Sequence, residues 1–236
     1  MARARKTSAR HSIDIDGQSV PVEVKRHPKA RRMILRLDRE GTGATVTIPS
    51  YVPFDDGLEM ARRKAAWIKR QLAKTPETVE FADGVEIPYL GEMMAVHHRP
   101  EGRGVVLRGG KILVAGRPEH LRRRLADWLK AQARKEMTER AHAKAKEIDK
   151  KITRITIRDT KSRWGSCGVG GTLNFSWRLV LAPEYVLDYV VAHEVAHLVH
   201  HNHSDWFWAL TERLCDRCDG ARDWLNAFGH DLHRYG

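Results

Sequence analysis

Short alternating segments fill the first half of the chain. Before residue 115, β-branched residues alternate or cluster in short runs that polar or glycine-containing turns separate, which is typical of strands. The expected strands are 12–24, 33–37, 44–48, 78–81, 86–90, 93–97, 105–107 and 112–114. One helix is predicted among them, at 55–74, because its apolar residues fall three or four positions apart. We therefore expect small β units around one helix, and no internal repeat is evident.

Helical patterns dominate the second half, from Pro118 onward. A long helix is predicted over 118–148, because apolar residues form a stripe there and few helix breakers interrupt it. Two strands, 155–157 and 172–177, should follow, with a glycine-rich turn at 164–171 between them. Two further helices are expected: one from Pro183 to the polar cluster 200–204, and one over 205–215. The predicted fold class is α+β, with a basic tail at 1–19, a β-rich subdomain at 20–117 and a second subdomain at 118–236.

Charge and composition narrow the class of protein. The 236 residues include 42 Lys and Arg against 30 Asp and Glu, so the net charge is +12 before histidine is counted. This excess is compatible with nucleic acid, an acidic ligand such as a nucleotide, or a solvated surface. No stretch is apolar for the roughly 18 residues that a membrane helix needs, so no membrane partner is expected. Three cysteines favour a reducing compartment, and we expect a cytoplasmic protein. The oligomeric state is left open.

A cluster of histidines is the feature that points to chemistry. His193, Glu194 and His197 form the pattern His-Glu-Val-Ala-His inside an apolar helical run. Histidines four residues apart share one helix face, so both imidazoles can reach one ion while the glutamate lies beside a water on that ion. Zinc in a hydrolase takes three protein ligands and acidifies a water, and the glutamate then serves as general base. Burying these side chains without a metal or a charge partner would cost folding free energy.

The third zinc ligand is predicted to be His203. It follows His197 by six residues, which is the offset in the longer zinc-binding motif with three histidines. Ser204 can cap the next helix and fix the turn. Other candidates remain, namely His200 and His201 in the same loop and Glu212 on the following helix.

Several nearby residues have less specific signals. Trp164 is read as a core anchor and Gly165 as a turn residue, in a loop that lines the cleft. Strand 173–177 would offer an edge on which an extended peptide could pair. Cysteine is not expected to act chemically, since Cys167 has no identifiable base and the pair Cys215 and Cys218 lacks a second pair. Candidate oxyanion donors are left unranked: Tyr185, Tyr189, Arg163, Lys161 and His201.

Taken together, 193–208, Ser162–Cys167 and Leu173–Arg178 closely resemble the YgjP-like metallopeptidase family, zincins related to the SprT-like and WLM groups. The similarity is strongest from about residue 161 to 208. The resemblance implies a minimal zincin-like fold at 118–236, a zinc ion on His193, His197 and His203, and Glu194 as the base.

Three functions follow as hypotheses. The leading one is a zinc-dependent metallopeptidase acting on a peptide or protein. The alternatives are a metal-dependent nucleotide (phosphoanhydride) hydrolase, motivated by the basic balance, and a nucleic-acid-associated protein with a structural zinc. A protease that acts on DNA-bound proteins would combine two of these properties.

Overall fold

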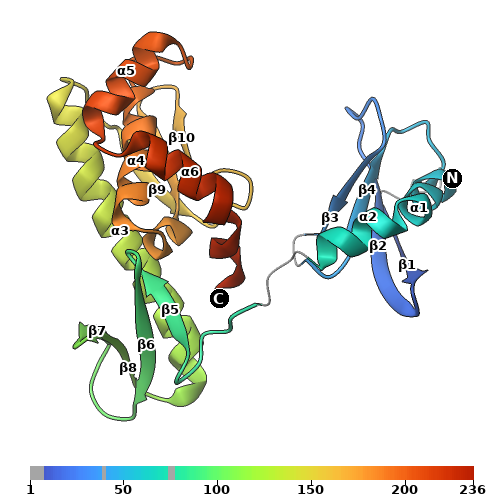
Figure 1. Ribbon diagram of the computed structural model, residues 1–236, viewed down its shortest axis with the longest axis horizontal. Helices are drawn as coiled ribbons and strands as arrows, with labels where there is room; N and C mark the ends of the chain where they lie inside the picture. The colour runs from blue at the N-terminus through green and yellow to red at the C-terminus, as the bar shows by residue number, and fades with distance from the viewer. Residues whose placement is uncertain (1–7, 39–40, 74–77) are drawn as a thin grey trace, which may run out of the picture. The chain divides into compact units, whose positions relative to one another are not determined.

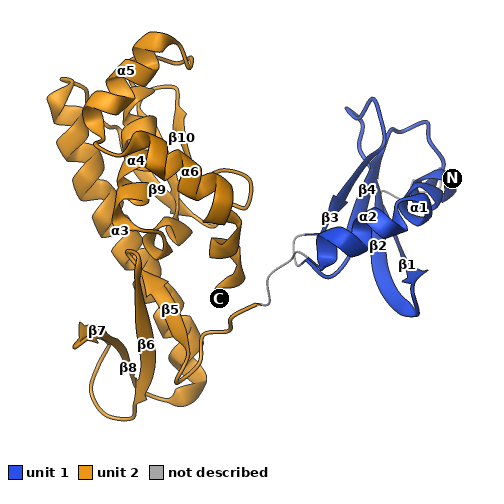
Figure 2. Cartoon of the chain, viewed as in Figure 1, with its two compact units in different colours: residues 1–76 blue, residues 77–236 orange. Residues whose placement is uncertain are grey.

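The chain divides into two compact units, Met1–Pro76 and Glu77–Gly236 (Figure 2). The computed structural model describes residues 8–38, 41–73 and 78–236. Mixed helices and small sheets confirm the predicted α+β class. The division at 76 differs from the predicted boundary at 117, because the second sheet packs on the long helix of the second unit. Residues 8–15 of the expected tail form a strand, and 1–7 lie outside the described residues.

The first unit is a four-stranded sheet with two helices. Its strands have the order β1-β2-β4-β3, in which β2 and β4 are parallel and the outer pairs antiparallel. The elements are β1 Ser8–Ile15, β2 Gln18–Arg26, β3 Ile34–Leu37, β4 Ala44–Ile48, α1 Phe54–Arg63 and α2 Ala65–Leu72. The single helix predicted at 55–74 is thus divided at Lys64, which has φ −100° and ψ 15°. Alternate strand residues and the helices' inner faces form a separate apolar core.

The second unit begins with a sheet of the same topology. Its order is β5-β6-β8-β7, again with a parallel central pair between antiparallel outer pairs. The elements are β5 Glu86–Tyr89, β6 Glu92–Arg99, β7 Val105–Arg108, β8 Lys111–Ala115, η1 Pro118–His120 and α3 Leu121–Glu147. The strand expected at 78–81 is absent, and Val79 instead makes an isolated bridge to Tyr235.

The two sheets form an internal repeat, contrary to the expectation that there is none. Both first hairpins turn through two consecutive positive φ angles, at Asp16 and Gly17 (53° and 81°) and at Leu90 and Gly91 (50° and 94°). Each sheet is followed by a helix that packs on it. The sequence signal is short: Arg-Arg-Lys-Ala-Ala-Trp-Ile-Lys ending at Lys69 aligns with Arg-Arg-Leu-Ala-Asp-Trp-Leu-Lys ending at Lys130.

The remaining elements surround α3 and a three-stranded sheet (Figure 1). They are β9 Arg154–Arg158, β10 Gly165–Gly168, β11 Thr172–Ser176, η2 Trp177–Leu181, α4 Glu184–Ala196, α5 Asp205–Leu214, α6 Cys218–Phe228 and η3 Gly229–Arg234. The sheet order β10-β11-β9 corrects two predictions. Part of the expected turn at 164–171 is strand β10, and β11, which was expected to be an edge, lies in the centre.

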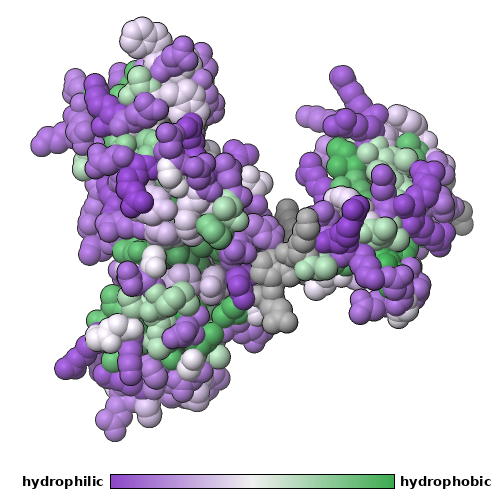
Figure 3. Space-filling view, viewed as in Figure 1, coloured by the Kyte–Doolittle hydropathy of each residue, from purple (hydrophilic) through white to green (hydrophobic). Residues whose placement is uncertain are grey.

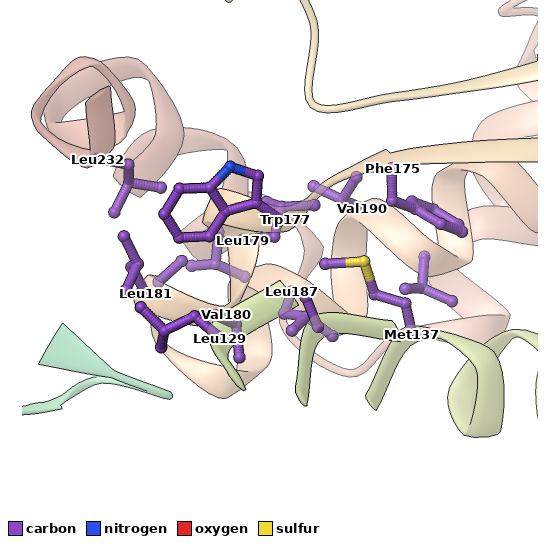
Figure 4. Packing of buried hydrophobic residues seen from close by; sticks show 14 of the residues in the cluster. Leu129, Met137, Phe175, Trp177, Leu179, Val180, Leu181, Leu187, Val190 and Leu232 are labelled. Carbon is purple, nitrogen blue, oxygen red and sulfur yellow. The ribbon is translucent and has the colours of Figure 1, made fainter. Parts of the chain in front are cut away.

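Helix α3 joins the two sheets of the second unit, β5-β6-β8-β7 and β10-β11-β9, into one core. It buries every fourth residue from Leu121 to Ala145, so one continuous stripe faces inward. Figure 4 shows Leu129 and Met137 of this stripe packed among side chains of η2, α4 and β11. All five η2 residues are buried, including Arg178, which donates to Asp159 at 2.9 Å and to the Leu232 carbonyl at 3.1 Å. The C-terminal segment is thereby tied to the loop after β9.

The visible face of the molecule is mostly polar. Hydrophilic side chains cover most of the visible face of each unit (Figure 3). None of the described helices is long and apolar enough to cross a membrane.

Candidate metal centre

Helix α4 presents the first two histidines of the motif. Its apolar residues bury nearly the whole helix against α3, η2 and α6. Regular helix ends at Ala196, earlier than the predicted 200–204, and His197 is the C-cap residue. The His197 backbone N–H still donates to the His193 carbonyl at 3.3 Å, so the two side chains keep the spacing of one helical turn.

His203 completes a triad from the loop before α5. One ring nitrogen from each of His193, His197 and His203 lies within 4.8 Å of the other two. The Nε2 atoms of His193 and His203 are 3.2 Å apart. Two nitrogens on a tetrahedral zinc ion are separated by about 3.3 Å, given Zn–N bonds of about 2.05 Å. The three side chains therefore fit one metal ion.

Hydrogen bonding and burial prepare the imidazoles to act as ligands. His197 Nδ1 lies 2.9 Å from the His200 carbonyl oxygen, which can only accept, so Nδ1 carries the proton and Nε2 keeps its lone pair. Burial, with His197 and His203 adding to it, lowers the pKa of His193 to about 4. Burial also lowers the pKa of His197. The neutral imidazole is the form that binds metal.

Aromatic rings of α5 pack against the three histidines. Phe207 is fully buried, and its ring centroid lies 4.5–4.9 Å from those of His193, His197 and His203. Trp208 packs on His193 and His203 at 5.9 and 5.6 Å. The sequence predicts these aromatic residues on a helix but gives them no role; their spacing, four and five residues after His203, is the signal that relates them to the triad. Ser204 is the N-cap residue of α5, as expected, but its side chain makes no capping hydrogen bond.

Glu194 lies beside the triad in a buried, tightly packed position. Its side chain is 5% exposed, and burial raises its pKa to about 7, opposed by a backbone hydrogen bond from Cys167 and by the charge of Arg163. The carboxyl packs directly on Gly165 of β10: a Cβ built there would lie 2.6 Å from Glu194 Oε1. Gly165 has no positive φ, so the glycine is required for close approach and not, as expected, for a turn.

Substituting Gly165 by alanine is expected to destabilise the second unit by about 1–3 kcal/mol, because the added methyl overpacks the Glu194 carboxyl. Gly168→Ala is the matched control in the same strand, where the nearest atom to a new Cβ is 3.6 Å away. Urea unfolding of the full chain measures both free energies. Equal stability of the two variants would contradict the close contact.

Trp164 has the structural role predicted for it. Its indole stacks on the His233 ring at 5.1 Å, and it packs against the main core. The Trp164 carbonyl accepts from the Ser176 backbone N–H at 2.8 Å, which aligns β10 with β11. The C-terminal segment thus supports the strand that contacts Glu194.

The other ligand candidates are not part of the cluster. Among the described residues, the only group of metal-binding side chains that converges is the histidine triad, and neither Glu212 nor His200 joins it. Burial raises the pKa of Cys167 and raises that of Cys218 to about 12, so both remain thiols. Cys215 and Cys218 are buried core residues, as expected.

Three of the five candidate oxyanion donors lie near the site: Tyr189, Arg163 and His201, whose charge reaches His197. The Tyr189 ring meets His193 edge-on at 6.0 Å but is buried, and burial raises its pKa to about 12. Arg163 is exposed, and its charge reaches Glu194. Tyr185 instead lies under the Arg217 guanidinium.

Comparison with known proteins identifies a family for the chain. A family model described as YgjP-like, metallopeptidase domain, matches residues 31–228. No curated protein and no solved structure shows significant similarity to the chain.

Proposed function

Since the chain belongs to the YgjP-like metallopeptidase family, whose activity implies a metal ion, we propose that it is a zinc-dependent peptidase. His193, His197 and His203 hold the zinc ion, and Glu194 is the general base. The observation that carries the proposal is the convergence of three imidazoles beside a buried carboxyl. A bound zinc ion supplies a Lewis acid that acidifies water and polarises the scissile carbonyl.

Glu194 moves the proton in this reaction. A buried carboxyl with a pKa of about 7 is matched to taking a proton at neutral pH and giving it up again. It takes the proton of the attacking water and delivers it to the leaving amine. The contact with Gly165 excludes water from one side of the carboxyl and fixes its position.

The substrate pairs with β10. Only β11 pairs with it among the described strands, so its second edge is free, and Gly165 brings that strand directly against Glu194. An extended peptide can add to such an edge through main-chain hydrogen bonds. This edge replaces β11 as the predicted substrate strand.

A hydrolase screen tests the proposal. Zinc-loaded protein is incubated with a proteome-derived peptide mixture and, separately, with nucleoside triphosphates. We expect metal-dependent peptide cleavage, detected by mass spectrometry. Phosphate release without peptide cleavage would instead support the phosphoanhydride hydrolase.

A second candidate, a protease of proteins bound to nucleic acid, is favoured by the distribution of charge. Residues 1–76 contain 17 Lys and Arg against 8 Asp and Glu, whereas 77–236 contain 25 against 22. The first unit thus carries +9 of the net +12, and a polyanion is expected to contact it.

Salt-dependent binding of a DNA duplex tests this second candidate. Four exposed basic residues of the first unit are replaced by Gln: Arg31, Arg32, Arg63 and Lys64. The control replaces four exposed basic residues of α3: Arg122, Arg123, Lys130 and Lys146. We expect only the first variant to reduce the slope of log K against log salt, by up to about 3.6. Equal slopes would exclude this surface.

A further inference from the structure

A polar cavity of about 390 Å³ lies beside β10 and is not used by the proposed chemistry. Two arginines, three hydroxyl residues and an amide contribute its polar lining: Arg158, Thr160, Ser162, Arg163, Ser166 and Asn174. These residues come from β9, β10, β11 and the loop 159–164. We call it the arginine cavity.

No salt bridge among the described residues compensates the charge of the arginine cavity, although the charge of Arg163 reaches the buried Glu194 carboxyl. Neither Arg158 nor Arg163 forms a salt bridge with a residue that the structure describes, and no acidic side chain lines the cavity. The neighbouring Asp159 is bound to Arg178, whose hydrogen bond and charge outweigh burial and lower the pKa of Asp159. The cavity therefore presents two guanidinium groups that make no salt bridge with a described residue, and such groups bind carboxylates and phosphates.

The side-chain amide of Asn174 in the cavity also lacks one hydrogen-bond partner among the described residues. Asn174 donates through Nδ2 to Ser166 Oγ at 3.3 Å, but the other end of its side-chain amide is buried with no hydrogen-bond partner among the described residues. This end is the Oδ1 oxygen, an acceptor, so it is satisfied by a donor such as a water molecule or a peptide N–H and not by the anion itself.

Strand geometry connects the arginine cavity to the peptidase site. Gly165 both lines the cavity and contacts the Glu194 carboxyl. Ser166 and Asn174 are register partners whose side chains bond to each other, on the sheet face opposite that of Gly165 and Cys167. A peptide paired with β10 alternates in the same way, so every second side chain is directed to the cavity side of the sheet.

We propose that the arginine cavity binds an anionic side chain, carboxylate or phosphate, of the peptide that pairs with β10. Arg158 and Arg163 supply the charge, and the hydroxyl groups complete the hydrogen bonds. The inference rests on the proposed peptidase function for its substrate, and it assigns acidic or phosphorylated sequences as the preferred class.

Binding to Glu194→Gln tests the inference without turnover. Peptides are selected from a randomised library on this variant, and one is then made with Glu, Gln or phosphoserine at the enriched position. We expect the Glu and phosphoserine peptides to bind about 10-fold tighter than the Gln peptide, as one charge-assisted contact provides. The Glu and phosphoserine arms distinguish the two sources of anion.

Substitutions at β9 locate the effect. Arg158→Gln, added to Glu194→Gln, should remove the preference, whereas Arg154→Gln, an exposed position on the same strand outside the cavity, should keep it. Arg158→Glu should reverse the preference toward a Lys peptide, which a structural role for Arg158 would not produce. An unchanged Glu-to-Gln ratio in Arg158→Gln would overturn the inference, and so would tight binding of inorganic triphosphate without any peptide preference.

The two proposals fail separately. Selective binding of acidic peptides without cleavage by the zinc-loaded native protein would contradict the proposed peptidase function but support anion binding by the arginine cavity. Cleavage without any acidic preference would do the reverse.

Discussion

Replacing Glu194 by glutamine is expected to lower peptide hydrolysis by roughly 10²- to 10⁴-fold, the usual contribution of a positioned general base. Glutamine keeps the shape of the side chain, so the contact with Gly165 and the packing against the triad remain. The amide can neither take a proton from water nor return one to the leaving amine. Rates are measured on a peptide from the cleavage screen, with the zinc content determined for both proteins.

Metal content and stability separate this effect from a folding defect. The variant should bind zinc as the native protein does, because the three imidazoles are untouched. Its thermal stability should be equal or higher, since a neutral amide costs less to bury than a carboxylate. Glu212→Gln, an exposed change of the same kind on α5, is the control and should keep full activity. Retention of more than about a tenth of the activity by Glu194→Gln would remove Glu194 from the general-base role.

Local periodicity made the main elements of the site predictable. The pairing of His193 with His197 follows from one helical turn, and the apolar run around them indicates a buried helix whatever the rest of the chain does. Most strands and α3 were also predictable, because their patterns are contained in the segments themselves.

The contribution of β10 to the site could not be predicted from the sequence, because it depends on non-local strand pairing. Strand β10 reads Gly-Ser-Cys-Gly, which has no β-branched residue and looks like a turn. It is a strand because β11 pairs with it, and Gly165 matters because Glu194, far along the chain, packs on it. Neither fact is contained in the segment, so the substrate edge was assigned to the apolar strand β11.

The division of the chain was hidden for a related reason. The pattern of a strand does not indicate which helix its sheet packs on. The predicted subdomain 20–117 therefore contains both four-stranded sheets, whereas the structure assigns them to different units. The aligned Trp67 and Trp128 segments would have shown that each sheet has its own following helix. A search for repeats that tolerates substitution would have moved the boundary close to residue 76.

Replacing His203 by alanine is expected to weaken zinc binding by more than about 100-fold. Loss of a hydrogen-bond partner of a ligand already costs 10- to 100-fold, and His203 is here a direct ligand. The side chain is exposed, so the metal-free protein should keep its stability. Competition with a chromogenic chelator gives the affinity, and the rise in the unfolding temperature with added zinc should shrink in parallel.

The neighbouring histidines make this prediction specific. His201→Ala removes an exposed imidazole from the same loop and should leave the zinc affinity unchanged. His200→Ala should also leave it unchanged, because His200 acts through its backbone carbonyl, which alanine retains and which still accepts from His197 Nδ1. A large loss in His200→Ala with none in His203→Ala would mean that the loop changes its ligand when metal binds. Equal losses in all three would indicate that the loop, and not one imidazole, determines the affinity.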